Sequence, residues 1–532
     1  MNKRFMMSSF LILSTMTVAA CADPEPENAV TGTNEQGDEE TPVTTEEKEN
    51  SVSLAWNSQP PTLDPHVTNT NVVRDLARPI FEQLVTFDES YEPIPMLADS
   101  FEENEDGSEI TFYLREGVLF HNDEEMTADD VVASMEKWQS GGAPAAAMGD
   151  STWEEIDEYT VKLHVDEPSI SVMYTLADVT QAAAIMPKEI IDSAGSTGVE
   201  QYIGTGPFQV EDWVYDSYIQ FSKFDDYQSL DGEPNGLGGK KEALVDDLFV
   251  YFVADDSTRT NGIITGEYDY AFQLPQDSYD QLEGADGIVN DVWPFGFQTL
   301  VFNKEGIFGD QSLRSAVNYG LNNEDLLALA FTDETFYEME PAYMRPEQTS
   351  WYTQAGEEHY DVYDLEQAEQ LLDEAGYSGE EITILTSEDY SYHYNSAIIT
   401  QQALEDFGMN ATLDATDWAT LLERRDQKEG WDIFFTQFTT VATPLSYPFL
   451  HSENEYAGWT NNEEIDRHLD GIRYADSQDE ATELFEDLQQ IIWEDLPVIN
   501  VGMVNFISSY SDDIDGYSEF MGPIFWNMSI EE

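Results

Sequence analysis

Hydrophobic residues recur along most of the chain with two periods, one typical of strands and one typical of helices. In SEITFYLREGV (108–118), Ile110, Phe112 and Leu114 fall on one face of an extended segment, which predicts a strand. The next run, TADDVVASMEKW (127–138), has acidic residues in the first turn after Thr127, which predicts a helix capped by that threonine. Strand and helix patterns therefore alternate in this part of the chain.

The same alternation continues between residues 364 and 438. Asp364 is placed to cap a helix and Gly376 to end it, and the apolar positions between them form one stripe: Leu365, Ala368, Leu371, Leu372 and Ala375. The segment EITILTS (381–387) follows as a strand, and both patterns recur up to residue 438. This order predicts an α/β fold, and the lack of a repeat of fixed period argues against a solenoid.

Composition and charge narrow the class of protein. Aromatic residues make up 12% of the chain, and a globular body of roughly 480 residues from Ser51 onward predicts two or three domains. The formal net charge of −87 at pH 7 repels nucleic acid and anionic membrane surfaces, so neither is expected as a partner. Because salt near 1 M shortens the Debye length to about 3 Å, we interpret the acidic surface as suited to a saline or alkaline exterior.

The first twenty residues have the order of an export signal. Lys3 and Arg4 precede an uncharged apolar stretch, and small residues close it before Cys21. The apolar stretch is shorter than the ~20 residues of a membrane span, so no transmembrane helix is expected in the mature protein. Cys21 is the only cysteine, and its setting after VAA resembles the bacterial lipoprotein box. The resemblance implies cleavage before Cys21 and a lipid anchor at the extracytoplasmic face of the cell membrane.

Residues 21–50 form an acidic segment between this cysteine and the globular body. They contain no aromatic residue and many carboxylates, so they cannot bury enough apolar surface to fold alone. A flexible coil of this length has a root-mean-square reach of roughly 30 Å. We therefore expect a tether that holds the body near the membrane surface.

A long run of motifs lies within residues 96–132, and further motifs lie elsewhere in the chain. The run comprises Leu97-Ala98-Asp99-Ser100-Phe101, Phe112, Leu114-Arg115, Gly117-Val118, Phe120-His121-Asn122-Asp123 and Thr127-Ala128-Asp129-Asp130-Val131. The others are Leu63-Asp64-Pro65, Gly204-Thr205-Gly206-Pro207-Phe208, Gly266-Glu267-Tyr268-Asp269, Leu313-Arg314-Ser315-Ala316, Glu374-Ala375-Gly376-Tyr377 and Asp495-Leu496-Pro497-Val498. With them, residues 51–532 resemble the family 5 extracellular solute-binding proteins, which serve peptide, nickel and related ABC importers.

The resemblance implies an α/β fold like that of periplasmic binding proteins, with two hinged lobes, an inserted smaller domain and a ligand cleft between the lobes. The expected domains are binding lobe I (51–72, 186–300 and 498–532), inserted domain II (73–185) and binding lobe III (301–497). It also implies a substrate-binding component that captures a peptide or similar small solute and delivers it to an ABC permease. Such a protein is expected to be a monomer without cofactor or metal, and not an enzyme.

Three stretches in positions that suit the family offer the aromatic and hydrogen-bonding groups of a solute cleft. One leaves the first strand, one is WPFGF (293–297), and one is the threonine-rich stretch that follows the buried strand DIFFTQF (432–438). For each single aromatic residue a place in the core is an equal alternative. The candidate ligand contacts are Trp56, Asn57, Phe295, Phe297, Thr439, Thr440, Thr443 and Tyr447.

The third stretch departs from the pattern of the peptide carriers that the chain resembles. Those carriers commonly place an Asp before a Pro here, to pair with the α-ammonium of the ligand, whereas this chain has Thr443 before Pro444. Loss of such a charge-assisted hydrogen bond removes about 1.5 to 3 kcal/mol. We therefore expect either weak discrimination between peptides with free and with acetylated amino termini, or a non-peptide solute such as an oligosaccharide or a metal chelate. A strong preference for free termini would mean that another acid, such as Asp417, has taken this role.

Other functions have little support in the sequence. A secreted hydrolase would be expected to carry a Gly-Xaa-Ser-Xaa-Gly elbow, which is absent, and NGLGGKK (235–241) has Pro234 and Lys241 where a phosphate loop needs Gly and Ser or Thr. The seven histidines lack the i, i+4 spacing of a helical metal site, which leaves only a site assembled from distant residues. Gly204 and Gly206 are expected to permit a tight turn that aims the next strand.

Overall fold

The computed structural model describes residues 50–531 except Ser196 and Thr332. Residues 48–532 form one compact unit by their contacts. The export signal, Cys21 and the acidic tether lie outside the described residues, so those expectations stay predictions. No helix among the described residues combines the length and the hydrophobicity needed to cross a membrane.

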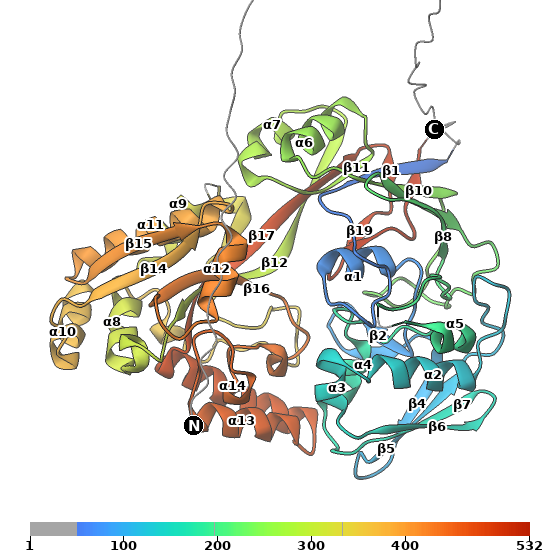
Figure 1. Ribbon diagram of the computed structural model, residues 1–532, viewed down its shortest axis with the longest axis horizontal. Coiled ribbons are helices and arrows are strands. Elements are labelled where there is room, and N and C mark those ends of the chain that lie inside the picture. Colours follow the sequence, from blue (N-terminus) through green and yellow to red (C-terminus); the bar gives the residue numbers. More distant parts are fainter. Residues whose placement is uncertain (1–49, 196, 332, 532) are drawn as a thin grey trace, which may run out of the picture. The chain divides into compact units, whose positions relative to one another are not determined.

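One mixed sheet of eleven strands runs through the body (Figure 1). Its strands in order are β15 (Asn410–Thr416), β14 (Glu381–Ser387), β16 (Ile433–Thr439), β12 (Ile288–Phe302), β17 (Val498–Ser511), β11 (Tyr270–Leu274), β1 (Ser51–Trp56), β10 (Asp247–Phe252), β9 (Tyr218–Lys223) and β8 (Phe208–Val214), with β13 (Tyr337–Glu338) pairing with β17. The strand predicted over residues 381–387 is β14, and its first neighbour, β15, is parallel to it. The mixture of parallel and antiparallel pairs with helices confirms the α/β class.

The two longest strands, β12 and β17, join the two parts of this sheet. They pair in antiparallel fashion from Ile288 opposite Ser511 to Val301 opposite Val498. In Figure 1 they run between the part of the body that holds α8 to α14 and the part that holds α1 to α5. Residues 296–302 of β12 and 498–509 of β17 are buried, so the crossing is also part of the core.

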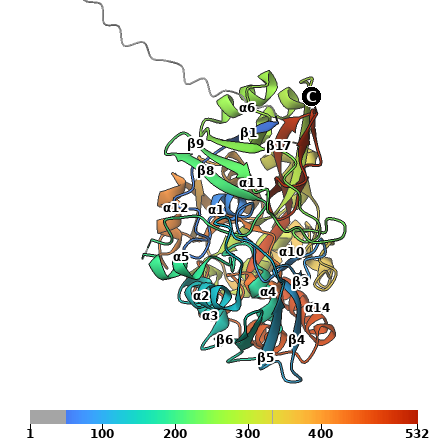
Figure 2. The ribbon, with the colours of Figure 1, turned by 90° about the vertical axis from the view of Figure 1, so that its right-hand side faces the viewer.

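A separate four-stranded sheet lies within the segment expected to be the inserted domain. Its order is β4 (Ala98–Glu103), β5 (Glu109–Leu114), β7 (Thr160–His164) and β6 (Thr152–Asp157), and a small hairpin of β2 (Val85–Phe87) and β3 (Pro93–Pro95) precedes it. Helix α2 (Ala128–Trp138) covers this sheet, and Figure 2 shows α2 and α3 above β4 to β6. Asp130 accepts a hydrogen bond from the backbone N–H of Thr127 at 2.9 Å, so the predicted helix start is confirmed.

The remaining helices are divided between the two parts of the body that β12 and β17 join (Figure 1). They are α1 (Asn71–Ala77), α3 (Gly142–Met148), α4 (Ser171–Ala177), α5 (Lys188–Ser193), α6 (Asp256–Thr265), α7 (Tyr279–Glu283), α8 (Gln311–Gly320), α9 (Asn323–Phe331), α10 (Leu365–Ala375), α11 (Ser391–Asp406), α12 (Trp418–Arg425), α13 (Glu463–Arg473) and α14 (Gln478–Asp495). Helix α10 begins and ends as predicted: Asp364 accepts from the N–H of Gln367, and Gly376 follows with φ +73°. Short strands β18 (Ile514–Asp515), β19 (Ser518–Glu519), β20 (Pro523–Ile524) and β21 (Ser529–Ile530) complete the chain.

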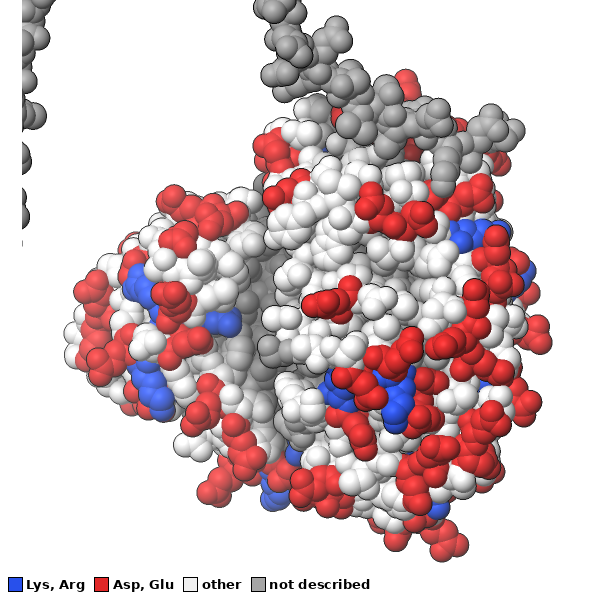
Figure 3. Space-filling model, turned by 45° about the vertical axis from the view of Figure 1, so that its right-hand side comes forward, with Lys and Arg blue, Asp and Glu red and all other residues white. Residues whose placement is uncertain are grey.

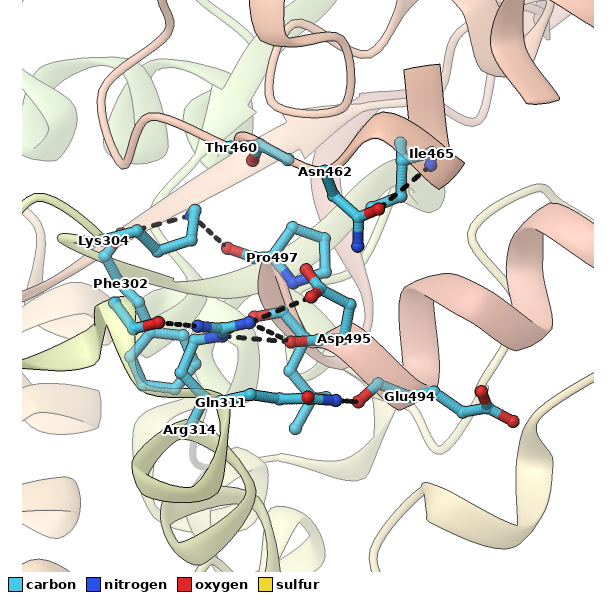
Figure 4. Close-up of polar contacts among 12 residues, drawn as sticks. Phe302, Lys304, Gln311, Arg314, Thr460, Asn462, Ile465, Glu494, Asp495 and Pro497 are labelled. Atoms are coloured by element: carbon cyan, nitrogen blue, oxygen red, sulfur yellow. Dashed lines mark hydrogen bonds and ion pairs between the residues drawn. The ribbon is translucent and has the colours of Figure 1, made fainter. Parts of the chain in front are cut away.

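Two of the motifs that carry the family resemblance, the one that contains Arg314 and the one that contains Asp495, lie in contact near the end of β12 (Figure 4). The Nε of Arg314 donates to the carbonyl oxygens of Asp495 and Leu496 at 3.0 Å each, and its Nη2 donates to Asp495 Oδ1 at 3.1 Å. Beside them, Lys304 Nζ donates to the carbonyl oxygen of Pro497 at 2.8 Å. These contacts fix α8 and the start of β17 to each other, so the two motifs have a structural role.

The glycine motif at residues 204–208 differs from its expected role as a tight turn. Neither Gly204 nor Gly206 has a left-handed backbone; instead, an added Cβ would lie 2.2 Å from the carbonyl oxygen of Ile80 and 2.3 Å from that of Pro79, respectively. His121 bonds to the same motif, because Gly204 N–H donates to its Nδ1 at 3.2 Å and its Nε2 lies 3.0 Å from Gly206 O. The glycines therefore permit a close approach between distant segments, which local sequence does not reveal.

The surface carries acidic residues over most of the face in Figure 3, with few basic ones among them. That face is hollowed by a furrow between two parts of the body, and mainly uncharged residues line the furrow in this view. Carboxylates are thus placed on the outer surfaces, where water and salt screen their mutual repulsion.

Candidate functional site

A cavity of about 1160 Å³ lies among segments that are far apart in the sequence. This exceeds the ~300–1,000 Å³ of pockets for single small molecules. Its lining residues fall within 69–91, 138–181, 293–295, 345–347, 437–454, 473–474 and 519–522. Only a folded chain brings these segments together, and the cavity is the natural candidate for the solute cleft.

One wall of the cavity is aromatic. Trp293 and Phe295 line it with ring centroids 6.2 Å apart, and Phe295 packs on Phe506 at 4.3 Å. Behind this wall, Phe272 is stacked on Trp293 at 6.0 Å, and Trp56 is stacked on Phe272 at 4.0 Å. The stacked rings give the wall a rigid backing in the core.

The stretch after β16 supplies a polar wall. Residues 437–443 line the cavity, and the backbone N–H of Thr440 donates to the carbonyl oxygen of Phe295 at 3.0 Å, which ties this wall to the aromatic one. Gln437 Nε2 and Thr440 Oγ1 are buried without a hydrogen-bond partner. Because an unpaired buried polar group costs about 1–3 kcal/mol, polar groups of a bound solute would be stabilised here.

Part of the expected contact set lines the cavity: Phe295, Thr439, Thr440, Thr443 and Tyr447. Thr443 is buried at the start of a 3₁₀ turn, and the hydroxyl of Tyr447 donates to the carbonyl oxygen of Tyr343 at 2.6 Å. Burial raises the pKa of Tyr447, so its phenol stays neutral and fixed in place. These residues present neutral hydrogen-bonding groups rather than charges.

The other expected contacts do not line the cavity. Trp56 is fully buried in the stack behind the aromatic wall. Phe297 is also buried, with its ring 5.5 Å from the rings of Tyr343 and Tyr447. Asn57 uses its amide to donate to Gln273 Oε1 at 3.0 Å. Trp56 and Phe297 support the walls from the core, because large aromatic side chains fill the core first.

Asp417, the alternative acid for a ligand ammonium group, lies at a helix end. Its carboxylate accepts from the N–H of Thr420 at 2.9 Å and caps α12, and it is not among the cavity-lining residues. The acids that line the cavity come instead from other segments: Glu89, Asp166, Glu167, Asp178, Glu347 and Glu519.

Glu519 belongs to a buried cluster of charges at the cavity wall. Its Oε1 accepts from the N–H of Gly522 at 2.7 Å, and its Oε2 is buried without a partner. Asp75 is fully buried nearby and accepts from Arg74 Nε at 2.7 Å. Burial, and then the charge of Asp75, raise the pKa of Glu519 to about 8, against the opposing effect of Arg78 and Arg74. Glu519 is therefore mainly protonated at pH 7.

Hydrogen bonds join two walls of the cavity. The hydroxyl of Tyr174 donates to one oxygen of Glu92 at 2.8 Å, and the hydroxyl of Ser350 donates to the other. The hydroxyl of Tyr474 donates to Glu167 at 2.8 Å. These contacts hold residues of the segment 92–174 against residues of the segment 350–474.

Sequence reasoning missed several lining residues: Tyr91, Tyr174, Arg345, Glu519 and Phe520. Trp293 lies in a stretch that was singled out, although not as a contact itself. The others come from segments without a local pattern of polar residues after a buried strand. Their only sequence signal was the expectation that the cleft is assembled from separated pieces of the chain.

The described residues offer no evident metal site. Within residues 50–531, leaving out the two that are not described, no group of three or more His, Cys, Asp or Glu side chains is arranged to hold a metal ion. Of the histidines, His121 and His393 are bonded within the core, and burial lowers their pKa to about 4 and about 3. The cavity is therefore built from hydrogen-bonding, aromatic and charged groups.

Comparison with known proteins gives a consistent set of matches. Residues 92–460 match the model of the family described as bacterial extracellular solute-binding proteins, family 5 (middle). The chain is 26% identical over 491 residues to a probable peptide ABC transporter periplasmic-binding protein of Sinorhizobium fredii, covering 87% of this chain and 91% of that protein. It is 26% identical over 488 residues to the glutathione-binding protein of Escherichia coli K12, covering 88% and 91%.

A similar solved structure is that of the A. tumefaciens R10 binding protein AgaA in complex with agropinic acid. It superposes with a TM-score of 0.73 at 23% identity, over 91% of this chain and 99% of that chain. The likeness confirms the expected two-lobe α/β fold.

Proposed function

Because the chain belongs to the bacterial extracellular solute-binding proteins of family 5, we propose that its cavity captures a peptide or similar small solute outside the cell and presents it to the permease of an ABC importer. The observation that carries this proposal is the cavity of about 1160 Å³, whose aromatic and threonine-rich walls come from separated segments. Buried polar atoms without partners at Gln437 and Thr440 leave hydrogen bonds for a solute to make. The role is binding, not catalysis.

A peptide is the first candidate solute. The family match and the two relatives, one a probable peptide-binding protein and one a glutathione-binding protein, support it. A non-peptide solute is the second candidate, because Thr443 stands where the peptide carriers resembling this chain place an Asp, and because the similar structure holds agropinic acid. The proposed contacts are Phe295, Thr439, Thr440, Thr443 and Tyr447, together with Trp293.

The test is to find what the protein carries. We expect native mass spectrometry of gently purified protein to show a retained small molecule, and calorimetry with that molecule to show an affinity that falls about 10- to 30-fold in Trp293→Ala, since central aromatic contacts dominate binding. The control is Tyr215→Ala, which removes an aromatic ring that is 72% exposed and does not line the cavity. Equal affinities in the two variants would place the binding site elsewhere.

We further propose that Cys21 carries a lipid and holds the protein at the extracytoplasmic face of the membrane. The support is the setting of the only cysteine after an apolar segment and VAA. Cys21→Ser should remove the anchor and release most of the protein into the medium, measured by fractionation and immunoblotting. Equal membrane fractions for the variant and the wild type would contradict the anchor.

A further inference from the structure

Arg345 occupies an unusual position in the cavity wall. It lies in the loop after β13, and its backbone is fixed to the polar wall through Gln348. The backbone N–H of Arg345 donates to Gln348 Oε1 at 2.9 Å, and Gln348 Nε2 donates to the carbonyl oxygen of Val441 at 2.6 Å. A rigid backbone therefore presents the guanidinium to the cavity.

The guanidinium of Arg345 is poorly paired for a buried group. The side chain is only 8% exposed, and its Nε donates to Glu347 Oε2 at 3.3 Å. Glu347 is itself 56% exposed, so this ion pair contributes little. Nη1 of Arg345 is buried without any partner. Burial of such a group is costly unless an acceptor pairs with it.

The other buried arginines of the described body are satisfied mainly by main-chain carbonyl groups. Arg78 donates to the carbonyls of residues 520–522, Arg259 to those of residues 253, 254 and 273, and Arg314 to those of residues 308, 495 and 496. Of the nitrogen atoms in the guanidinium groups of Arg78, Arg259 and Arg314, only Nε of Arg259 is buried without a partner. No described main-chain carbonyl group bonds to the guanidinium of Arg345, whose one side-chain partner is the exposed Glu347.

We propose that Arg345 binds a carboxylate, or another planar anionic group, of the solute. This inference rests on the proposed function, because it gives the chemical class of a solute in the same cavity. A guanidinium presents parallel N–H groups that match the two oxygens of a carboxylate. Its charge also acts on the phenols of Tyr91 and Tyr447, both of which line the cavity. Since the hydroxyl of Tyr447 already donates to the carbonyl oxygen of Tyr343, the anion would meet the hydroxyl of Tyr91 beside the cation.

Because the protein as a whole is strongly negative, the binding of an acidic solute depends on this buried cation. A net charge of −87 repels anions at long range, so an acidic solute gains nothing from steering. Pairing with Arg345 takes place in a wall from which water is largely excluded, where charge-assisted hydrogen bonds are strong and salt screens them little. Added salt should therefore favour the binding of an acidic solute by weakening only the repulsion.

The test uses two pools of synthetic tri- and tetrapeptides, one with free carboxyl termini and one with the same sequences as carboxyl-terminal amides. Native mass spectrometry compares the wild type with Arg345→Gln and with the control Arg467→Gln, which removes an arginine that is 69% exposed and does not line the cavity. In parallel, the unfolding midpoint of each protein is measured in sodium acetate and in sodium chloride at equal ionic strength. Acetate serves as a probe for a non-peptide acid.

We expect the wild type and Arg467→Gln to retain free acids roughly 10- to 100-fold better than amides, and Arg345→Gln to lose this preference. If neither pool binds, an acetate-specific rise of the midpoint that Arg345→Gln abolishes supports an anion site for a non-peptide acid. Equal retention of both pools by the wild type overturns the inference and leaves the proposed function intact. Absence of both pool binding and an acetate effect also overturns it, and the retained-molecule experiment then judges the proposed function separately.

A purely structural role of Arg345 has a different signature. Without solute, Arg345→Gln should unfold at the wild-type midpoint or above it, because Nη1 has no partner and the ion pair with the exposed Glu347 contributes little. A lower midpoint with unchanged preference for free acids would show that Arg345 serves the fold and would overturn the inference. Arg345→Lys, which keeps the charge but not the parallel N–H groups, should keep part of the preference and serves as the second variant if Arg345→Gln does not fold.

Discussion

Replacing Lys241 by Met should destabilise the protein by about 3–5 kcal/mol, because it leaves a buried carboxylate without its cation. Lys241 and Glu82 are both 2% exposed, with 3.2 Å between Nζ and Oε1. Glu82 also accepts from the hydroxyls of Tyr227 at 2.8 Å and Thr205 at 3.0 Å, while Lys241 Nζ lies 4.5 Å above the ring of Trp526. The pair is therefore the centre of a network that joins four distant segments.

The neighbouring lysine offers a matched control for this prediction. Lys240 pairs with Glu242 at 2.7 Å, but the two side chains are 49% and 44% exposed, so Lys240→Met should cost less than ~1 kcal/mol. Urea unfolding at pH 7 measures both variants, and the double variant Glu82→Gln, Lys241→Met should recover part of the loss. Equal midpoints for the two single variants would contradict the role of the buried pair.

Replacing Glu519 by Gln should change how stability depends on pH. The carboxyl has an ordinary pKa of 4.5 in the unfolded chain and about 8 in the fold, so the folded state binds its proton more tightly. Folding stability therefore falls as pH rises from about 4.5 to about 8, by on the order of 5 kcal/mol, and the loss is complete above this window. Gln cannot ionise, so Glu519→Gln should be the more stable protein at pH 9 and close to wild type at pH 5.

Unfolding midpoints at pH 5, 7 and 9 test this expectation. Glu89→Gln is the matched control, because Glu89 is an exposed acid that lines the same cavity. Removal of one surface charge should have a small and nearly constant effect over this range. A difference between Glu519→Gln and wild type that is the same at pH 5 and pH 9 would show that Glu519 does not titrate as described.

Much of the fold could be predicted because its signals are local. The stripe and caps of α10 and the strand β14 depend on residues within one element, and the structure reproduces their bounds. The roles of Gly204 and Lys241 could not be predicted in this way. Position 204 needs a glycine because the carbonyl oxygen of Ile80 leaves no room for a Cβ, and position 241 needs a cation because Glu82 is buried beside it. Both partners lie more than a hundred residues earlier in the chain.

The candidate site also has one part that local sequence predicts and another part that depends on contacts between distant segments. The wall formed by residues 437–443 was predictable, since polar residues directly after a buried strand suit a cleft better than a core. Arg345 was not, because its lack of hydrogen-bond partners is a property of its neighbours in space. Trp56 was a candidate contact with the core as an equal alternative, and it lies in the core, where its ring backs the wall through Phe272. The period of hydrophobic residues along the chain does not distinguish a residue of the cavity wall from a residue of the core behind it.

The pairing of Val301 with Val498 has a further consequence. Residues 303–497 leave and rejoin the large sheet through these two neighbouring strands, about 5 Å apart. Beyond β17 the sheet continues with β11, β1, β10, β9 and β8. All five of these strands come before residue 303 in the sequence. The whole segment is thus attached as the elaborated tip of one long hairpin. A change of length inside this segment leaves the order of the strands beyond β17 unchanged.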